Sequence, residues 1–483
     1  MRPPNLLFIF PDQMRGSALG CLGEEPVHTP RLDALAGQSR VLTEAVGTYP
    51  VCSPYRAMML AGRYPHQTGV LGNCNSNHTP YGCELPGDMR CWPDVLRAAG
   101  YSLGYIGKWH LDAPHKPYVD TANNRGTPAW NEWTPPDRRH GFDYWYARGT
   151  HDDHNRPMYW TGDADRDGFH YVDQWSPEHE ADQAIRFLDN ADGACRDPDK
   201  PFALVVSMNP PHTPYDQHPP EYLEPYAGLS DEDLVAGRGN VAPAGTRWGD
   251  HARKHLRHYY ACITGVDTQV GRILDALEAR GLADDTLVVF TSDHGDCVGA
   301  HGHNTKSIWW EPSLRVPFLV RWPGRIRPGR DPLLIGAPDI APTLLGLLGQ
   351  ADAMPDGMTG SDLSGALLDR PGAHRPDAQL YLWPVVARPE LGARGVRTER
   401  HTLVLAQRER TVRPHVSSPP YPDADPVLLF DRRADPWQQH NRAGEEPGRV
   451  RELIRDHLLP LLERAGDPFD PGREHAAWLP HDD

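Results

Sequence analysis

Residues 49–69 read YPVCSPYRAMMLAGRYPHQTG, and this stretch decides how the rest of the chain is interpreted. It contains the spacing C-x-P-x-R, formed by Cys52, Pro54 and Arg56, and the apolar run that follows predicts a short helix ending at Gly62. The first turn of a helix presents free backbone N–H groups and the positive end of the helix dipole. A side chain at this junction favours anions, and Arg56 adds a fixed cation one turn on. The stretch therefore predicts an anion site around Cys52, although a lone cysteine is more often a small core residue.

The composition is that of a large, acidic, folded protein. The chain has 483 residues, of which 39% are apolar, so it can bury a sizeable core in one large unit or in two or three domains. Acidic residues outnumber basic residues by 65 to 49, which gives a formal net charge of −16. Such a surface does not favour nucleic acid or an anionic membrane as a partner. An anionic substrate must therefore be held by a local group of cations.

The cysteines and the N-terminal segment suggest a compartment. The chain has eight cysteines and no CxxC pair, so a zinc site is not expected. The apolar run at residues 6–10 is too short for a signal peptide, and no stretch reaches membrane-spanning length. We therefore expect a cytoplasmic protein with mostly reduced thiols.

Short apolar runs alternate with amphipathic segments over most of the chain, which predicts an α/β fold with a large, mostly parallel sheet flanked by helices. This α/β unit is expected to span residues 1–370. Residues 112–175 and 217–254 show little periodicity and are interpreted as long loops. Strands are predicted at 6–10, 41–46, 101–106, 202–207, 286–291 and 315–320, and helices at 92–99, 177–188, 256–277 and 339–348, with another helix starting at Pro30.

The pattern changes at about residue 370. Short strands are predicted at 380–383 and 402–406, joined by turn-rich segments, and a closing helix is predicted at 449–465. We therefore expect residues 371–483 to form a small C-terminal α+β subdomain with an antiparallel sheet.

Polar residues follow four of the predicted strands, and the carboxyl ends of parallel strands meet at one crevice. Carboxylate, amide and imidazole groups there suit a hard divalent cation. Cationic side chains suit a tetrahedral oxyanion such as sulfate or phosphate. A histidine there could donate a proton to a leaving oxygen. The ligand candidates are Asp12, Gln13, Asp293 and His294, the cations are Lys108, Lys306 and Arg56, and the histidines are His110 and His212.

One further cluster, His151-Asp152-Asp153-His154, lies in a predicted loop over the crevice. Loop clusters of this kind are more often solvated or in contact with substrate than bound to metal, so no metal is assigned to it.

Eight segments together resemble the sulfatase family of the alkaline phosphatase superfamily, from Asn5 to about Pro436. They are NLLFIFPDQ, CSPYRAMMLAGRYPHQTGV, GYIGKWHL, NPPHTPY, TSDHGDCVGAHGHNTK, WEPSLRVPFLV, PDIAPTLLGLLG and LLFDRRADP. The resemblance implies an alkaline phosphatase-like fold and hydrolysis of a sulfate ester to an alcohol and sulfate. It also implies that a formylglycine-generating enzyme oxidises Cys52 to formylglycine, because an unmodified thiol would not easily release a covalent sulfate.

The resemblance also implies roles for the residues at the strand ends. The metal ligands would be Asp12, Gln13, Asp293, His294 and the modified Cys52, and the metal Ca²⁺, with Mg²⁺ and Mn²⁺ as alternatives. Gln13 and His294 replace the Asp and Asn of the commonest pattern, which leaves the identity of the metal open. In the implied mechanism, hydrated formylglycine attacks sulfur while Lys108 and Lys306 hold the sulfate oxygens. His212 protonates the leaving alcohol, and His110 then helps to expel sulfate. Arg56 orients the diol, and Asn73 lies near the metal or sulfate.

Two other functions fit parts of this pattern. A phosphonate monoester or phosphodiester hydrolase on the same fold would use the same metal ligands, but is not expected to keep Lys108 with His110. A catalytically inactive binding protein would be expected to lose Cys52, Lys108 or a metal carboxylate, and all are present. We therefore expect a sulfatase that acts on a small-molecule or saccharide sulfate ester. The sequence leaves the oligomeric state open.

Overall fold

The computed structural model describes residues 3–407 and 426–479. Within them, ten strands form one sheet in the order β10-β2-β9-β8-β1-β7-β3-β4-β5-β6. The central strands, from β8 to β4, are parallel, and the strands that flank them include antiparallel pairs. The strand bounds are β1 (Asn5–Pro11), β2 (Arg40–Leu42), β3 (Ser102–Lys108), β4 (Tyr144–Arg148), β5 (Met158–Thr161), β6 (His170–Tyr171), β7 (Phe202–Met208), β8 (Thr286–Thr291), β9 (Phe318–Arg321) and β10 (Gly329–Asp331).

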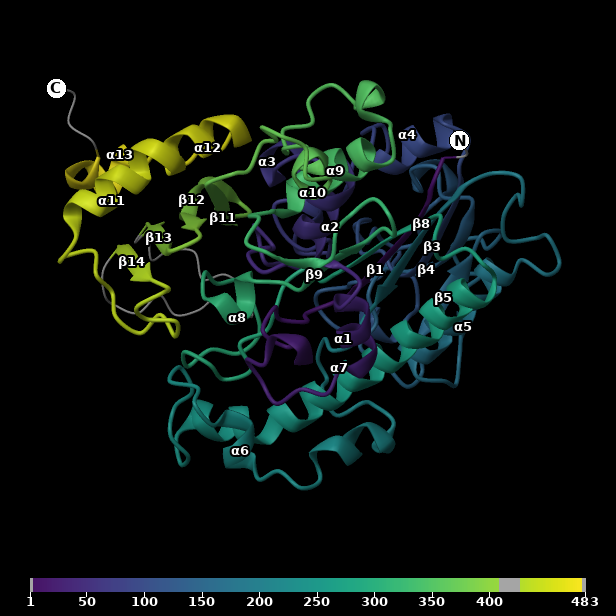
Figure 1. Cartoon of the computed structure of the whole chain (residues 1–483), viewed down its shortest axis with the longest axis horizontal. Coiled ribbons are helices and arrows are strands. Elements are labelled where there is room, and N and C mark those ends of the chain that lie inside the picture. Colours follow the sequence, from purple (N-terminus) through teal and green to yellow (C-terminus); the bar gives the residue numbers. More distant parts are fainter. Residues whose placement is uncertain (1–2, 408–425, 480–483) are drawn as a thin grey trace.

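Helices cover both faces of this sheet (Figure 1). The helix bounds are α1 (Pro30–Ala36), α2 (Cys52–Ala61), α3 (Pro65–Thr68), α4 (Trp92–Ala98), α5 (Ser176–Asp189), α6 (Asp231–Val235), α7 (Arg247–Ala279), α8 (Glu311–Leu314), α9 (Ile340–Leu347), α10 (Ser364–Leu367), α11 (Pro447–Leu453), α12 (Leu459–Ala465) and α13 (Gly472–His475).

Strand β1 shows why the sheet needs helices on both sides. All seven of its residues are buried. Leu6, Phe8 and Phe10 pack in one core with α2, α4 and α9, whereas Leu7 and Ile9 pack in a second core with α1, α5 and α7. Because successive side chains of a strand point to opposite faces, an uninterrupted apolar strand belongs in the middle of such a sheet.

A second, antiparallel sheet lies in the C-terminal part of the chain, as expected. Its strands follow the order β11 (Ala378–Val385), β12 (Arg388–Thr398), β13 (His401–Ala406) and β14 (Val427–Asp431). The predicted closing helix corresponds to α11 and α12, which a π-helical turn joins at Ile454–Leu458. Figure 1 shows α11 to α13 as yellow helices beside this sheet. The predicted fold class is therefore confirmed, whereas the domain boundary at residue 370 stays a prediction.

The structure corrects several predicted element bounds. Strands β4, β5 and β6 lie in a region that was interpreted as loops, because such short, partly exposed strands leave no clear period in the sequence. Helix α7 begins at Arg247 rather than at residue 256, since the Thr246 hydroxyl accepts a hydrogen bond from the Gly249 N–H at 3.2 Å and caps it. Strand β2 ends at Leu42, and β9 begins only at Phe318.

No helix in the described part of the chain combines the length and the apolar character that crossing a bilayer requires.

Candidate active site

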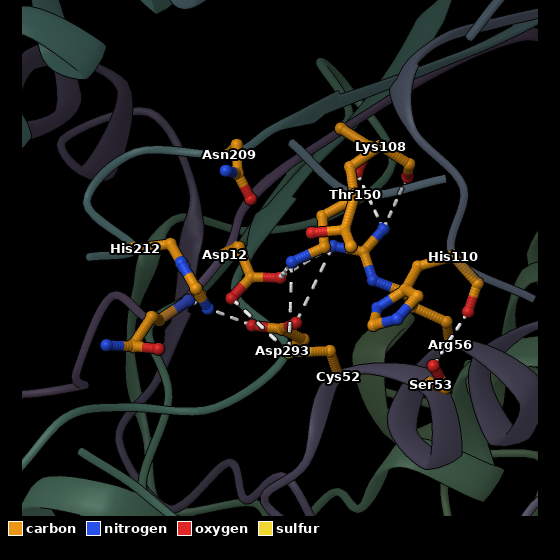
Figure 2. Close-up of polar contacts among 12 residues, drawn as sticks. Asp12, Cys52, Ser53, Arg56, Lys108, His110, Thr150, Asn209, His212 and Asp293 are labelled. Atoms are coloured by element: carbon orange, nitrogen blue, oxygen red, sulfur yellow. Dashed lines mark hydrogen bonds and ion pairs between the residues drawn. The ribbon is translucent and has the colours of Figure 1, made fainter. Parts of the chain in front are cut away.

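Four neighbouring strands bring the predicted site residues together. Asp12 follows β1, Lys108 is the last residue of β3, His212 lies four residues beyond β7, and Asp293 lies two residues beyond β8. These strands adjoin in the order β8-β1-β7-β3, so their carboxyl ends share one edge of the sheet. Figure 2 shows Asp12, Asp293 and His212 in one group with Cys52. The predicted meeting of these strand ends is therefore present in the structure.

Cys52 is the first residue of α2 and lies at the centre of the group. Its Sγ is 3.2 Å from Nζ of Lys306, 3.8 Å from Nζ of Lys108 and 3.4 Å from Nε2 of His294. Burial and the charge of Asp12 oppose ionisation, but the two lysines and His294 hold the pKa of the thiol well below its usual range. Several cations therefore surround the position that the sequence identified as an anion site.

Asp12 is paired with two cations. Nζ of Lys108 lies 2.7 Å from its Oδ2, and Nη2 of Arg56 lies 3.1 Å from the same oxygen. Burial opposes ionisation, but Lys108 and the other neighbouring cations hold the pKa of Asp12 well below its usual range. Arg56 is itself fixed by hydrogen bonds from Nη1 to the carbonyl oxygen of Lys108, at 2.6 Å, and to Oγ of Ser207, at 2.8 Å.

The donor set fits a divalent cation. One ligand atom each from Asp12, Cys52, Asp293 and His294 lies within 4.8 Å of the other three. The His294 ring donates from Nδ1 to the carbonyl oxygen of Gly295 at 2.9 Å, so Nε2 is the ring nitrogen left to face a metal. Oδ2 of Asp293 is buried and accepts no hydrogen bond from any residue that the structure describes. Burial and the charge of Asp12 raise the pKa of Asp293 to about 6, and a bound cation would favour its ionised form.

Gln13, the fifth predicted ligand, has its side chain in hydrogen bonds. Its Oε1 accepts from Nζ of Lys306 at 2.7 Å, and its Nε2 donates to Asp296. Its backbone N–H donates to Oδ1 of Asp293 at 2.9 Å, and its φ of 72° turns the chain sharply at this point. Gln13 thus holds Asp293 and Lys306 in place, while its role as a ligand stays a prediction.

The two predicted catalytic histidines differ in environment. His110 is 2% exposed, and neither ring nitrogen has a hydrogen-bond partner in the described part of the chain. Burial lowers its pKa to about 4, so it is neutral at pH 7 and suited to accept a proton. The side chain of His212 is 16% exposed and lies on the other side of Asp12 in Figure 2. The two histidines therefore lie on opposite sides of Asp12, and their roles as base and acid stay predictions.

Asn73 contacts the first turn of α2 through its side chain. Its Oδ1 accepts a hydrogen bond from the N–H of Ser53 at 3.1 Å, so it satisfies one of the free donors of the first helical turn. It is therefore next to Cys52 in space, and its predicted contact with metal or sulfate stays a prediction.

Several buried polar atoms around the site have no hydrogen-bond partner among the described residues. They are Nε of Arg56, both ring nitrogens of His110, Oδ1 of Asn209 and Oδ2 of Asp293. Buried polar groups in folded proteins are normally hydrogen-bonded, so such a group of exceptions indicates a place that binds a ligand.

Sequence reasoning missed three residues that support the site. Ser207 binds Arg56, and Asp296 holds the amide of Gln13 and accepts a hydrogen bond from the Tyr215 hydroxyl at 2.5 Å. Asn209 is fully buried beside the site. Ser207 is the next-to-last residue of β7, Asn209 follows β7 directly, and Asp296 lies five residues beyond β8. The signal of polar residues near strand ends was therefore available for them.

Fold and site define a hydrolase of the alkaline phosphatase type that handles an anionic ester. The model of the family described as Sulfatase matches residues 4–350, and that described as N-sulphoglucosamine sulphohydrolase, C-terminal, matches residues 299–460. The chain belongs to the sulfatase family and is a sulfuric ester hydrolase.

Relatives match along nearly the whole chain. An endo-4-O-sulfatase of Bacteroides thetaiotaomicron is 36% identical, over 96% of this chain and 93% of its own length. An ulvan-active sulfatase of Formosa agariphila is 35% identical, over 96% of this chain and 82% of its own length. A solved Bacteroides fragilis structure named for the sulfatase yidJ is 47% identical with a TM-score of 0.90, over 99% of this chain and 98% of that one.

The alternative hydrolase is more distant. A phosphonate monoester hydrolase of Agrobacterium radiobacter has a TM-score of 0.66 at 24% identity, over 96% of each chain, which shows a shared fold alone. The comparisons therefore support hydrolysis of sulfate esters over hydrolysis of phosphonates.

Proposed function

We propose that the protein hydrolyses sulfate esters of saccharides, and that Cys52 is converted to formylglycine for this reaction. The observation that carries the proposal is the position of Cys52 at the start of α2, between Lys306, Lys108 and the metal-ligand group. The names of the two relatives support the saccharide, since one gives the sulfate position 4-O and the other names ulvan. Hydrated formylglycine supplies an oxygen nucleophile, and a divalent metal lowers the pKa of such a hydroxyl.

The cationic residues would then bind and position the reacting groups, and the two histidines would transfer protons. Lys108 and Lys306 bind the oxygens of the sulfate group and offset its negative charge. Arg56, fixed by two hydrogen bonds, keeps position 52 and Asp12 in place. His212 donates a proton to the leaving alcohol, and neutral His110 accepts one from the nucleophile side when sulfate is released. The overall reaction adds water to R–O–SO₃⁻ and yields R–OH and sulfate.

We further propose Ca²⁺ as the metal held by Asp12, Asp293, His294 and position 52, with Mg²⁺ and Mn²⁺ as alternatives. Two carboxylates support a hard cation, whereas an imidazole ligand is less usual for Ca²⁺ and keeps Mn²⁺ in consideration. A cytoplasmic location and maturation by a formylglycine-generating enzyme also stay predictions. Cell fractionation tests the first of these, and the mass of the Cys52 peptide after expression with and without that enzyme tests the second.

The deciding experiment uses protein whose conversion at position 52 has been verified by mass. We expect kcat/KM for 4-O-sulfated oligosaccharides to exceed that for an aryl sulfate, choline sulfate and a phosphonate monoester measured on the same preparation. Cys52→Ala and Lys108→Ala should each abolish turnover of every sulfate ester. A higher kcat/KM for the phosphonate, or full activity of Lys108→Ala, would overturn the proposal.

A further inference from the structure

The cluster His151-Asp152-Asp153-His154 has no part in the site described so far. Both histidines are 1% exposed, whereas both aspartates are exposed. Neither histidine belongs to a group with metal-ligand spacing in the part of the chain that the structure describes. Buried imidazoles are normally held by hydrogen bonds, so the partners of these two rings are the informative observation.

The two histidines hold the loop that carries His212. Nε2 of His154 donates to the carbonyl oxygen of His212 at 2.8 Å, and the backbone N–H of His154 donates to Oε1 of Gln217 at 2.7 Å. At the start of the loop, Nδ2 of Asn209 donates to the carbonyl oxygen of His151 at 2.9 Å. The loop is therefore fixed at its beginning, in its middle and at its end by one neighbouring segment.

Hydrogen bonds to backbone carbonyl oxygens assign the tautomers of the His154 and His212 rings. A carbonyl oxygen can only accept, so Nε2 of His154 carries the hydrogen, and burial lowers the pKa of His154 to about 3 and keeps the ring neutral. Nδ1 of His212 lies 2.8 Å from the carbonyl oxygen of Thr213 and donates to it. Nε2 is then the nitrogen of His212 that is left to exchange a proton with a leaving group.

We propose that His154 is a positioning residue for His212. The Nε2–H of His154 fixes the backbone of His212 and so aims Nε2 of His212 at the leaving oxygen. The proposal rests on the proposed function, in which His212 is the acid. Asp152 does not serve this purpose, because its carboxylate is 3.7 Å from Nδ1 of His212 and half of its side chain is exposed. A displacement of about 1 Å in a reacting group can lower a rate about 100-fold, so one backbone hydrogen bond is enough to matter.

The test compares sulfate esters whose leaving groups differ in acidity. 4-Nitrophenol leaves without a proton, whereas an alkyl or sugar alcohol needs the acid, so a misplaced acid affects the second kind of ester. For His154→Phe, which keeps a ring and removes the donor, we expect kcat/KM to fall about 10- to 100-fold with an alkyl sulfate. With 4-nitrophenyl sulfate the change should stay below about threefold. His154→Gln, which returns an N–H near the place of Nε2, should restore most of the lost activity.

Double variants and a measurement without turnover complete the test. Because both residues act on one proton transfer, His154→Phe should cause no further loss in a His212→Ala background. Equal losses with both esters, or losses that multiply in the double variant, would overturn the proposal.

Imidazole ¹⁵N shifts of the full chain should show His212 with hydrogen on Nδ1, and His154→Phe should change that tautomer ratio; an unchanged ratio would also overturn it. If verified protein hydrolyses no sulfate ester, the proposed function fails, and these shifts still decide the role of His154.

Discussion

His154 makes the stability of the protein depend on pH. Burial lowers its pKa to about 3, against about 6.5 in an unfolded chain. Between these values the unfolded state binds a proton that the folded state does not, so stability falls as the pH drops below about 6.5. At pH 5 this cost is about 2 kcal/mol, since one pKa unit corresponds to about 1.4 kcal/mol. His154→Gln has no such cost. The stability of the variant minus that of the wild type should therefore be about 2 kcal/mol larger at pH 5 than at pH 7.5.

Equilibrium urea unfolding at the two pH values measures this difference. His110, His151 and His301 also have lowered pKa values, but they are present in both proteins and cancel in the comparison. A stability difference between variant and wild type that is the same at both pH values would contradict a neutral His154 in the folded chain.

Metal binding should stabilise the folded chain through Asp12 and Asp293. Burial and the charge of Asp12 raise the pKa of Asp293, so a cation beside Asp293 would favour its ionised form. A cation that binds only the folded state stabilises it by about 2.7 kcal/mol at 100 times its Kd. Adding Ca²⁺ or Mn²⁺ to chelator-treated protein should therefore raise the unfolding temperature, and Asp293→Asn should lose most of this rise. An equal rise in both proteins would place the ion elsewhere.

The sequence predicts residues at this scale when their position follows from one strand. Asp12, Lys108 and Asp293 each end or follow an uninterrupted apolar run, so their place at the crevice could be predicted. His154 could not be placed in this way, because its partner is a backbone carbonyl 58 residues away. A contact of this kind depends on how two loops pack and leaves no local pattern.

At the scale of elements, the end of β3 depends on the glycine that precedes Lys108. Gly107 has a φ of 98°, and a Cβ at this position would lie 2.0 Å from the carbonyl oxygen of Ser207 on β7. Gly107→Ala must therefore move β3 away from β7 and displace Lys108, the next residue. We expect a loss of more than about 2 kcal/mol of stability, from the strained backbone and the clash together, and at least about a tenfold loss of kcat/KM.

Gly100 is the matched control for this prediction. It precedes β3 with a similar φ of 88°, but a Cβ there would meet nothing within 4 Å. Gly100→Ala should therefore cost only the strained backbone, about 1–2 kcal/mol, and leave kcat/KM unchanged. Urea unfolding and turnover of an aryl sulfate measure both variants, and equal effects at the two positions would contradict the importance of close packing between β3 and β7.

Whole elements were predictable to very different degrees. The buried strands β1, β3, β7 and β8 are continuous apolar runs, and the sequence placed each of them within one or two residues. Strands β4 to β6 are shorter, and β6 has only two residues, so neither length nor period separates them from a loop. They are strands because the edge of an existing sheet pairs with them.

At the scale of the whole molecule, four charges join the two sheets. Arg397 of β12 forms a two-pronged contact with Glu311 of α8, from Nε at 2.7 Å and Nη2 at 2.8 Å, and also lies 2.9 Å from Glu44. Arg432, which follows β14, lies 2.7 Å from Glu44 and 3.3 Å from Glu311. Burial opposes ionisation of Glu311, but Arg397 and Arg432 hold its pKa well below its usual range. The contact therefore connects the C-terminal sheet to the segment that follows Lys306.

Removing one partner of this cluster should weaken the whole molecule. Arg397→Leu removes the two-pronged contact with Glu311 and leaves Arg432 as the arginine that contacts both carboxylates, with Arg315 3.8 Å from Glu311. Breaking a buried ion pair in this way costs about 3–5 kcal/mol. The exposed pair of Arg433 and Glu399 is the control, because both of its side chains are more than half exposed and Arg433→Leu should cost less than about 1 kcal/mol. Urea unfolding followed by tryptophan fluorescence measures both variants. A small loss for Arg397→Leu would mean that apolar packing alone, through residues such as Tyr381 and Leu382 in the shared core, holds the two sheets together.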